Sequence, residues 1–254
     1  SLTRAKETAD STWYRRADEA ASRALAVNPR NVLALEAAGT LANARHRFAD
    51  ALGPATTSLR LAPDRFAALE ILTDAQIELG RYREGFATAQ KRLELRPDLA
   101  SYSRASYAAE LRGERALATA LMRQAVDASR PGSGDRAWAQ VHVGLLELGS
   151  GNLDAARVAM TAARATAPDD ATALAGDAHV KAVSGNLDDA AALYREALAA
   201  QQTAVLASNL AEVELARGHR EASDEALALA ARLDAREAAN GVQLELDQAA
   251  VEAD

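Results

Sequence analysis

Four histidines are the side chains of this sequence best suited to acid–base or metal chemistry: His46, His142, His179 and His219. They fall in different repeats of the pattern described below, and only His142 and His179 are expected on one surface. A zinc site needs three or four ligands. The chain has no cysteine, and no aspartate or glutamate stands out as a third ligand for this pair. We therefore expect no metal site, and interpret the histidines as surface residues or peptide contacts.

Catalytic motifs give no better candidate. The sequence has no GxxxxGK phosphate loop, no HExxH and no GxSxG. The segment Gly132-Ser133-Gly134 follows an expected helix, whereas a dinucleotide-binding loop follows a strand. Carboxylates are abundant, but on helices they are expected to form solvated faces rather than an acid–base pair. We predict a chain that is not an enzyme and needs no cofactor.

One apolar stripe points to binding instead of catalysis. Trp138, Val141, Leu145 and Leu148 advance by three, four and three residues, which is one side of a helix. Val143, Gly144 and Leu146 can pack that helix separately. The stripe therefore predicts an exposed patch of the kind that binds partners. A second interpretation of Trp138 stays open, in which it packs against the preceding turn and seals the glycine-rich segment.

A repeat positions this stripe. Prolines end segments at Pro29, Pro63, Pro97 and Pro131, each 34 residues apart, and GNLDAA at Gly151 returns as GNLDDA at Gly185. A fixed period of this length predicts stacked supersecondary units. We place seven repeats at residues 1–29, 30–63, 64–97, 98–131, 135–168, 169–202 and 203–236. Residues 237–254 are expected to be a terminal helix or the start of a truncated repeat.

Each repeat is expected to hold a first helix A and a second helix B, with a single continuous domain over residues 1–254. The expected helices are Ser1–Asp10, Thr12–Val27, Val32–Arg45, Ala49–Leu61, Phe66–Leu79, Tyr82–Leu95, Ala100–Arg112, Arg115–Ala128, Arg136–Leu148, Leu153–Ala165, Ala171–Val183, Leu187–Ala200, Ala204–Ala216, Arg220–Leu233 and Val242–Glu252.

The turn and packing residues resemble the tetratricopeptide repeat family over nearly the whole chain. In repeat five the matching positions are Val143, Gly144, Gly151, Leu153, Ala156, Ala163 and Pro168. The departures are Gly85, where alanine is usual, Arg92, which replaces the second small residue, and Asp177, where an apolar residue normally packs. Asp177 stands four residues before Lys181, so we expect a pair along the helix surface, with a polar contact facing the groove as the alternative. The resemblance implies an all-α, right-handed superhelical solenoid of antiparallel helix pairs, about seven repeats long.

The resemblance also implies that A helices line a concave groove that binds a protein or peptide. Mapped onto this sequence, Glu36 and Glu70 make the first part of that groove acidic, so a clamp for a partner's terminal carboxylate is not expected. The residues predicted to bind the partner are Arg104, Tyr107, Trp138, Val141, His142, Leu145, Leu148, His179 and Asn209.

Charge and composition narrow the partner class. The net charge is −7, with +3 on residues 1–97 and −10 on residues 98–254. No basic stripe with interleaved aromatics appears, which argues against nucleic acid, and no apolar run approaches the ~18 residues of a spanning helix. The favoured function is a non-catalytic protein-interaction scaffold. The alternatives are an accessory domain of a larger enzyme or transcriptional regulator, and self-association through the terminal helices. A cytoplasmic location is slightly favoured, with a cleaved N-terminal signal left open because the chain starts at Ser1.

Overall fold

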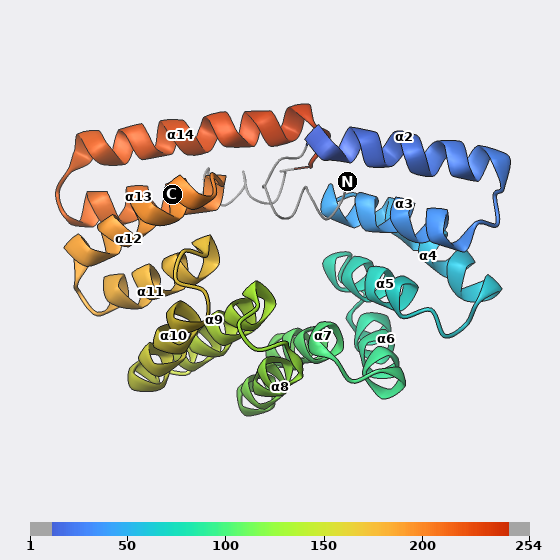
Figure 1. Cartoon of the computed structure of the whole chain (residues 1–254), viewed down its shortest axis with the longest axis horizontal. Helices are drawn as coiled ribbons and strands as arrows, with labels where there is room; N and C mark the ends of the chain where they lie inside the picture. Colours follow the sequence, from blue (N-terminus) through green and yellow to red (C-terminus); the bar gives the residue numbers. More distant parts are fainter. Residues whose placement is uncertain (1–11, 244–254) are drawn as a thin grey trace. The chain divides into compact units, whose positions relative to one another are not determined.

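The structure, a computed structural model, describes residues 12–243. Over this range the chain is an all-α solenoid of thirteen helices and contains no strand (Figure 1). The helices are α2 (Thr12–Val27), α3 (Val32–Ala44), α4 (Phe48–Leu61), α5 (Phe66–Glu78), α6 (Tyr82–Leu95), α7 (Leu99–Leu111), α8 (Arg115–Ala128), α9 (Gly134–Gly149), α10 (Leu153–Thr166), α11 (Ala171–Val183), α12 (Leu187–Ala200), α13 (Ala204–Ala216) and α14 (Arg220–Ala239).

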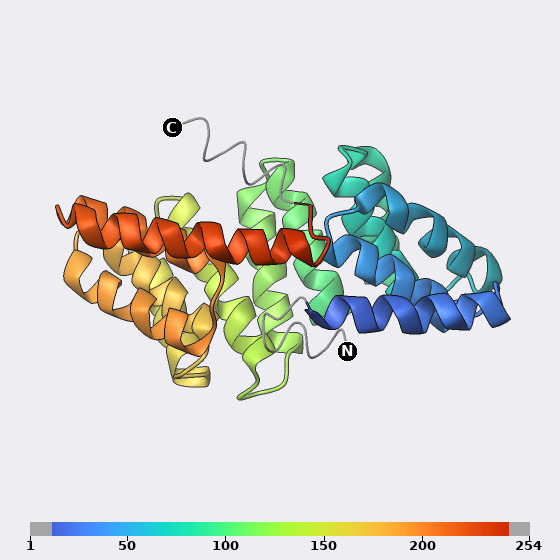
Figure 2. The ribbon, with the colours of Figure 1, turned by 90° about the horizontal axis from the view of Figure 1, so that it is seen from above.

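The helix bounds confirm the repeat pattern closely. Every expected helix inside the described range begins and ends within two residues of its predicted bounds, except α14, which continues from Leu233 to Ala239. No proline stops α14 at the repeat end; it ends instead at Asn240-Gly241, where Gly241 has φ +81°. It is a single uninterrupted helix (Figure 2). The helices predicted for Ser1–Asp10 and Val242–Glu252 fall wholly or almost wholly outside the described residues.

The chain forms two compact units. Within the described range, unit 1 comprises residues 12–96 and 234–243, and unit 2 comprises residues 97–233. In unit 2 the helices α7, α9 and α11 form one row, and α8, α10 and α12 form a second row packed against it (Figure 1). The prediction of one continuous domain stays a prediction.

The turns between helix A and helix B share one backbone conformation. Gly80, Gly113, Gly151, Gly185 and Gly218 all have φ between +71° and +83°, a region that only glycine enters without steric cost. After each glycine the next amide closes the helix end, as where Asn152 donates to the Glu147 carbonyl at 2.9 Å. At the corresponding place in the turn between α3 and α4 stands His46, with φ +56°.

Small residues let the helices approach closely. Met160 of α10 is fully buried between Gly144 of α9 and Gly176 of α11. A Cβ added at Gly144 would lie 2.6 Å from the Met160 ε-methyl, and one at Gly176 would lie 2.8 Å from its sulfur. The glycines are therefore required by the bulk of the methionine between them.

The departures from the repeat pattern have local explanations in unit 1. A Cβ at Gly85 would lie 2.7 Å from Ile77, so the larger side chain on α5 accounts for the glycine. Arg92 is 2% exposed and donates to the Glu70 carboxylate at 2.7 and 3.0 Å. Glu36 is also buried and accepts two hydrogen bonds from Arg65, at 2.5 and 2.7 Å. Glu36 is thus paired inside unit 1, so its assignment to an exposed acidic groove was wrong, whereas Glu70 is half-buried and its assignment stays a prediction.

The predicted pair of Asp177 with Lys181 was also wrong. The Lys181 ammonium instead lies 3.4 Å from the carboxylate of Asp189 on α12. An ion pair between α11 and α12 therefore replaces the expected ion pair within α11.

Candidate interaction surface

The candidate site lies on the A helices of unit 2, α7, α9, α11 and α13. Counted from the turn glycine that follows each helix, the sixth residue before it is Tyr107, Leu145, His179 and Glu212 in turn. All four are exposed, Tyr107 to 42% and Leu145 to 38%. Because the helices repeat the same register, we expect these four side chains to lie on corresponding sides of their helices, and we call the four residues the inner row. Its first two members are large and apolar, and its last two are polar.

Trp138 and His142 lie on α9 beside Leu145. Their rings are tilted against each other with centroids 3.9 Å apart, and both side chains are half-buried. His142 Nδ1 lies 2.9 Å from the Trp138 carbonyl oxygen. Since a carbonyl only accepts, Nδ1 carries the proton and donates it, which leaves Nε2 as the acceptor in the neutral ring. Burial lowers the pKa of His142, against weaker opposing effects of this hydrogen bond and of Glu110.

The predicted apolar stripe divides into two sides. At about 100° per residue, Val141 and Leu148 lie roughly 60–80° to one side of Trp138, whereas Leu145 lies within about 20° of it. Val141 is 3% exposed and packs with Met160, and the half-buried Leu148 packs on the same cluster. The assignment of Val141 to the partner-binding surface was therefore wrong. The space it fills is left by Gly176, whose added Cβ would lie 3.0 Å from Val141.

The remaining predicted residues are less prominent. Arg104 is half-buried, and its Nη1 donates to the Ala100 carbonyl of its own helix at 3.1 Å. His179 is exposed in the inner row, and Asn209 is half-buried on α13. Trp138 packs against a buried cluster that includes Met122 and Ala125 of α8, and the nearby Arg136 donates to the Val126 carbonyl of α8 at 2.9 Å.

Sequence reasoning missed two buried carboxylates. Glu147 accepts from Arg123 at 2.6 Å and from Asn152 at 2.8 Å. Glu214, 1% exposed, accepts from Arg195, from Arg217 and from His219. Both stand four residues before a turn glycine, and that shared register was the signal available in the sequence. Each carboxylate is held by cationic or amide donors, which favours a structural role over acid–base chemistry.

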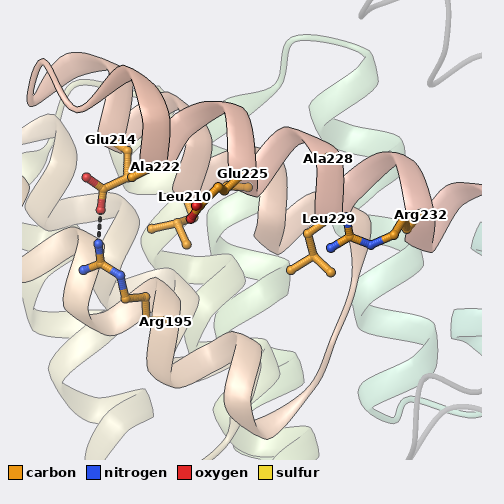
Figure 3. A pocket seen from close by; sticks show the side chains of 9 residues that line it. Arg195, Leu210, Glu214, Ala222, Glu225, Ala228, Leu229 and Arg232 are labelled. Atoms are coloured by element: carbon orange, nitrogen blue, oxygen red, sulfur yellow. Dashed lines mark hydrogen bonds and ion pairs between the residues drawn. The ribbon is translucent and has the colours of Figure 1, made fainter.

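A pocket of about 510 Å³ lies beside Glu214, between α12, α13 and α14. Figure 3 shows Arg195 of α12 reaching the carboxylate of Glu214, with Leu210 nearby and Leu229 further along α14, beside Arg232. It contains none of the predicted site residues. The paired Arg195 and Glu214 neutralise each other, and Glu225 and Arg232 add one charge of each sign, so the lining has no net charge to select a ligand.

Metal chemistry finds no geometric support in the described part of the chain. Across residues 12–243, no three His, Asp or Glu side chains lie close enough together to hold a metal ion. Three of the four histidines have separate partners, His46 with Gln243, His142 with Trp138 and His219 with Glu214. In the same range, no helix is both long and apolar enough to cross a membrane.

Comparison with known proteins identifies the fold. No protein-family model and no curated protein sequence matches the chain. A tetratricopeptide repeat protein from Parabacteroides merdae is similar in structure, with a TM-score of 0.66, 18% identity, and coverage of 85% of this chain and 84% of that one. PilF of Pseudomonas aeruginosa gives a TM-score of 0.61 and 12% identity over 78% of this chain and 90% of its own.

A longer protein is similar as well. A chain of the APC/C hetero-tetramer Cut9–Hcn1 gives a TM-score of 0.65 and 13% identity over 84% of this chain, which spans only 42% of that chain's length. The chain described here thus has the tetratricopeptide-repeat fold, as the turn and packing residues predicted.

Proposed function

We propose that this tetratricopeptide-repeat solenoid is a non-catalytic scaffold that binds a protein partner through the inner row of unit 2. The observation that carries the proposal is the exposure of Tyr107 and Leu145 at one register of successive A helices. Helix packing does not need either side chain in that position, because each A helix also buries a separate apolar side. Exposed apolar residues next to an aromatic ring are typical of binding hot spots.

The neighbours of the inner row support a protein partner over a small molecule. Trp138 and His142, on the same helix as Leu145, offer the half-buried edges of two tilted rings and one acceptor, Nε2 of the neutral imidazole. Leu111, Val183 and Leu215, near the ends of three A helices, are also exposed, to between 42% and 56%. These residues form a spread of separate contacts, which suits an extended peptide or a helix rather than a compact ligand. Among the similar structures, one belongs to a hetero-tetramer and another is PilW, described as a type IV pilus biogenesis factor.

The experiment is affinity capture from an extract of the source cells, followed by mass spectrometry. Tyr107→Ala and Leu145→Ala are compared with wild type and with Leu117→Ala. Leu117 is a matched control because it is 46% exposed on α8, a B helix of the same unit. We expect proteins retained by wild type and by Leu117→Ala to be lost from Tyr107→Ala and Leu145→Ala. Equal capture by all four proteins, or no specific capture at all, would overturn the proposal.

A further inference from the structure

The turn between α3 and α4 breaks a pattern that the other A-to-B turns obey. His46 is the one non-glycine residue with positive φ between residues 12 and 243, at φ +56°. Its turn closes as the others do, with the Arg47 amide donating to the Ala42 carbonyl at 2.8 Å. Glycine is therefore the residue that best fits the backbone conformation here too. A histidine in the left-handed region lowers the free energy of unfolding by on the order of 1 kcal/mol. The contacts of its side chain outside the turn can offset that cost.

The His46 ring contacts the chain 197 residues further on. Its Nδ1 lies 3.0 Å from the carbonyl oxygen of Gln243, and the Gln243 amide donates to the Arg45 carbonyl at 3.0 Å. Both main-chain groups of Gln243 are thus held by two adjacent residues of the turn. Phe48 stacks on the imidazole with centroids 5.7 Å apart and planes 13° apart, which fixes the direction of the ring.

Arg45 extends this contact on the other side of the turn. It is 7% exposed and donates to Asp18 of α2 at 2.9 Å. Gly241 lies against it, since a Cβ built there would be 3.7–3.9 Å from the guanidinium group. Gly241 is itself left-handed and ends α14, so it directs the following residues onto the turn. All of these residues belong to unit 1.

We propose that the α3–α4 turn is a docking site for the chain's own segment Asn240–Gln243, and that His46 occupies a glycine position because its ring completes this site. The two hydrogen bonds read only the main chain of Gln243, so the segment is recognised by its backbone rather than by its side chains. Unit 1 is then assembled from two segments 197 residues apart in the sequence, and its helices α3 and α4 depend on residues that are translated after all of unit 2.

The test uses the full chain and follows amide hydrogen exchange at Gln243. Exchange reports local opening of the contact directly. His46→Gly removes the ring and relieves the left-handed cost, so this variant is expected to fold, yet the Gln243 amide should exchange at least tenfold faster than in wild type. Gln243→Ala is the control: the site uses no side-chain atom of Gln243, so protection should be retained.

Three results would overturn the proposal. One is a Gln243 amide that exchanges in wild type as fast as in an unstructured peptide. Another is unchanged protection in His46→Gly. The third is protection that increases with protein concentration, because the segment would then dock onto a second copy rather than onto its own chain.

Discussion

At the scale of single residues, the Trp138–His142 pair is the most informative part of the candidate surface. Trp138 is half-buried, so its loss should destabilise unit 2 by ~1–3 kcal/mol, less than the ~3–5 kcal/mol expected for a fully buried tryptophan. Trp138→Ala, measured by chemical denaturation, gives this value, and Trp138→Phe should recover part of the loss because it keeps a ring against His142. A change below ~0.5 kcal/mol would show that the indole is a surface contact alone.

His142 provides a prediction about pH. Because burial favours the neutral imidazole, the folded chain binds this proton less readily than the unfolded chain does. The contribution of His142 to stability is therefore fully present above about pH 6.5, the usual pKa of histidine, and is lost as the pH falls through the lower pKa of the folded state. Titration of the ring protons by NMR should show His142 with a pKa below the usual value of histidine.

His142→Gln identifies that histidine by removing its resonance, and should reduce the fall in melting temperature on acidification. A pKa at or above the usual value would contradict the burial of the ring. Trp138→Ala should raise the pKa of His142, since the indole is part of what buries it.

At the scale of elements, the turn glycines carry the sharpest prediction. Gly151 and Gly185 have φ of +81° and +80°, and no atom lies within 4 Å of an added Cβ at either one. Gly→Ala there should cost about 1 kcal/mol through the backbone alone. Gly149→Ala is the matched control, because this glycine also has open space around it but ends α9 without a positive φ. The control should be neutral or stabilising. Thermal melts that rank Gly149→Ala at or below the turn variants would refute this account.

The same elements show what the sequence could and could not predict. Helix bounds followed from glycine and proline because their effect on the backbone is local. The burial of the Val141 side chain could not be predicted in this way, because it depends on the space beside Gly176 on another helix. Nor could the pairing of Glu36 with Arg65 and of Glu70 with Arg92, because these partners lie 29 and 22 residues away. Within the candidate site, the exposed register of Tyr107 and Leu145 was predictable from the period, whereas the ring contact between Trp138 and His142 was not anticipated.

At the scale of the whole molecule, the open question is whether the two units unfold together. The chain has two tryptophans, Trp13 in unit 1 and Trp138 in unit 2. Trp138→Phe leaves a fluorescent probe of unit 1, and Trp13→Phe leaves one of unit 2. If the repeats form one continuous domain, coupling between neighbours should make each probe's denaturation midpoint coincide with that variant's loss of helix, measured by circular dichroism. Midpoints that separate by more than the fitting error would contradict a single domain.

The packing of Met160 has a consequence for the chemistry of oxidation. All sulfur in this protein resides in Met122 and Met160, which are 4% and 0% exposed. Conversion to the sulfoxide adds a polar oxygen, and at Met160 this oxygen would be placed in a fully buried, closely packed site. Peroxide should thus react with Met160 only in molecules whose α9, α10 and α11 have momentarily separated, and the sulfoxide would prevent those helices from closing again. The rate at which sulfoxide accumulates at Met160 therefore measures how often α9, α10 and α11 separate.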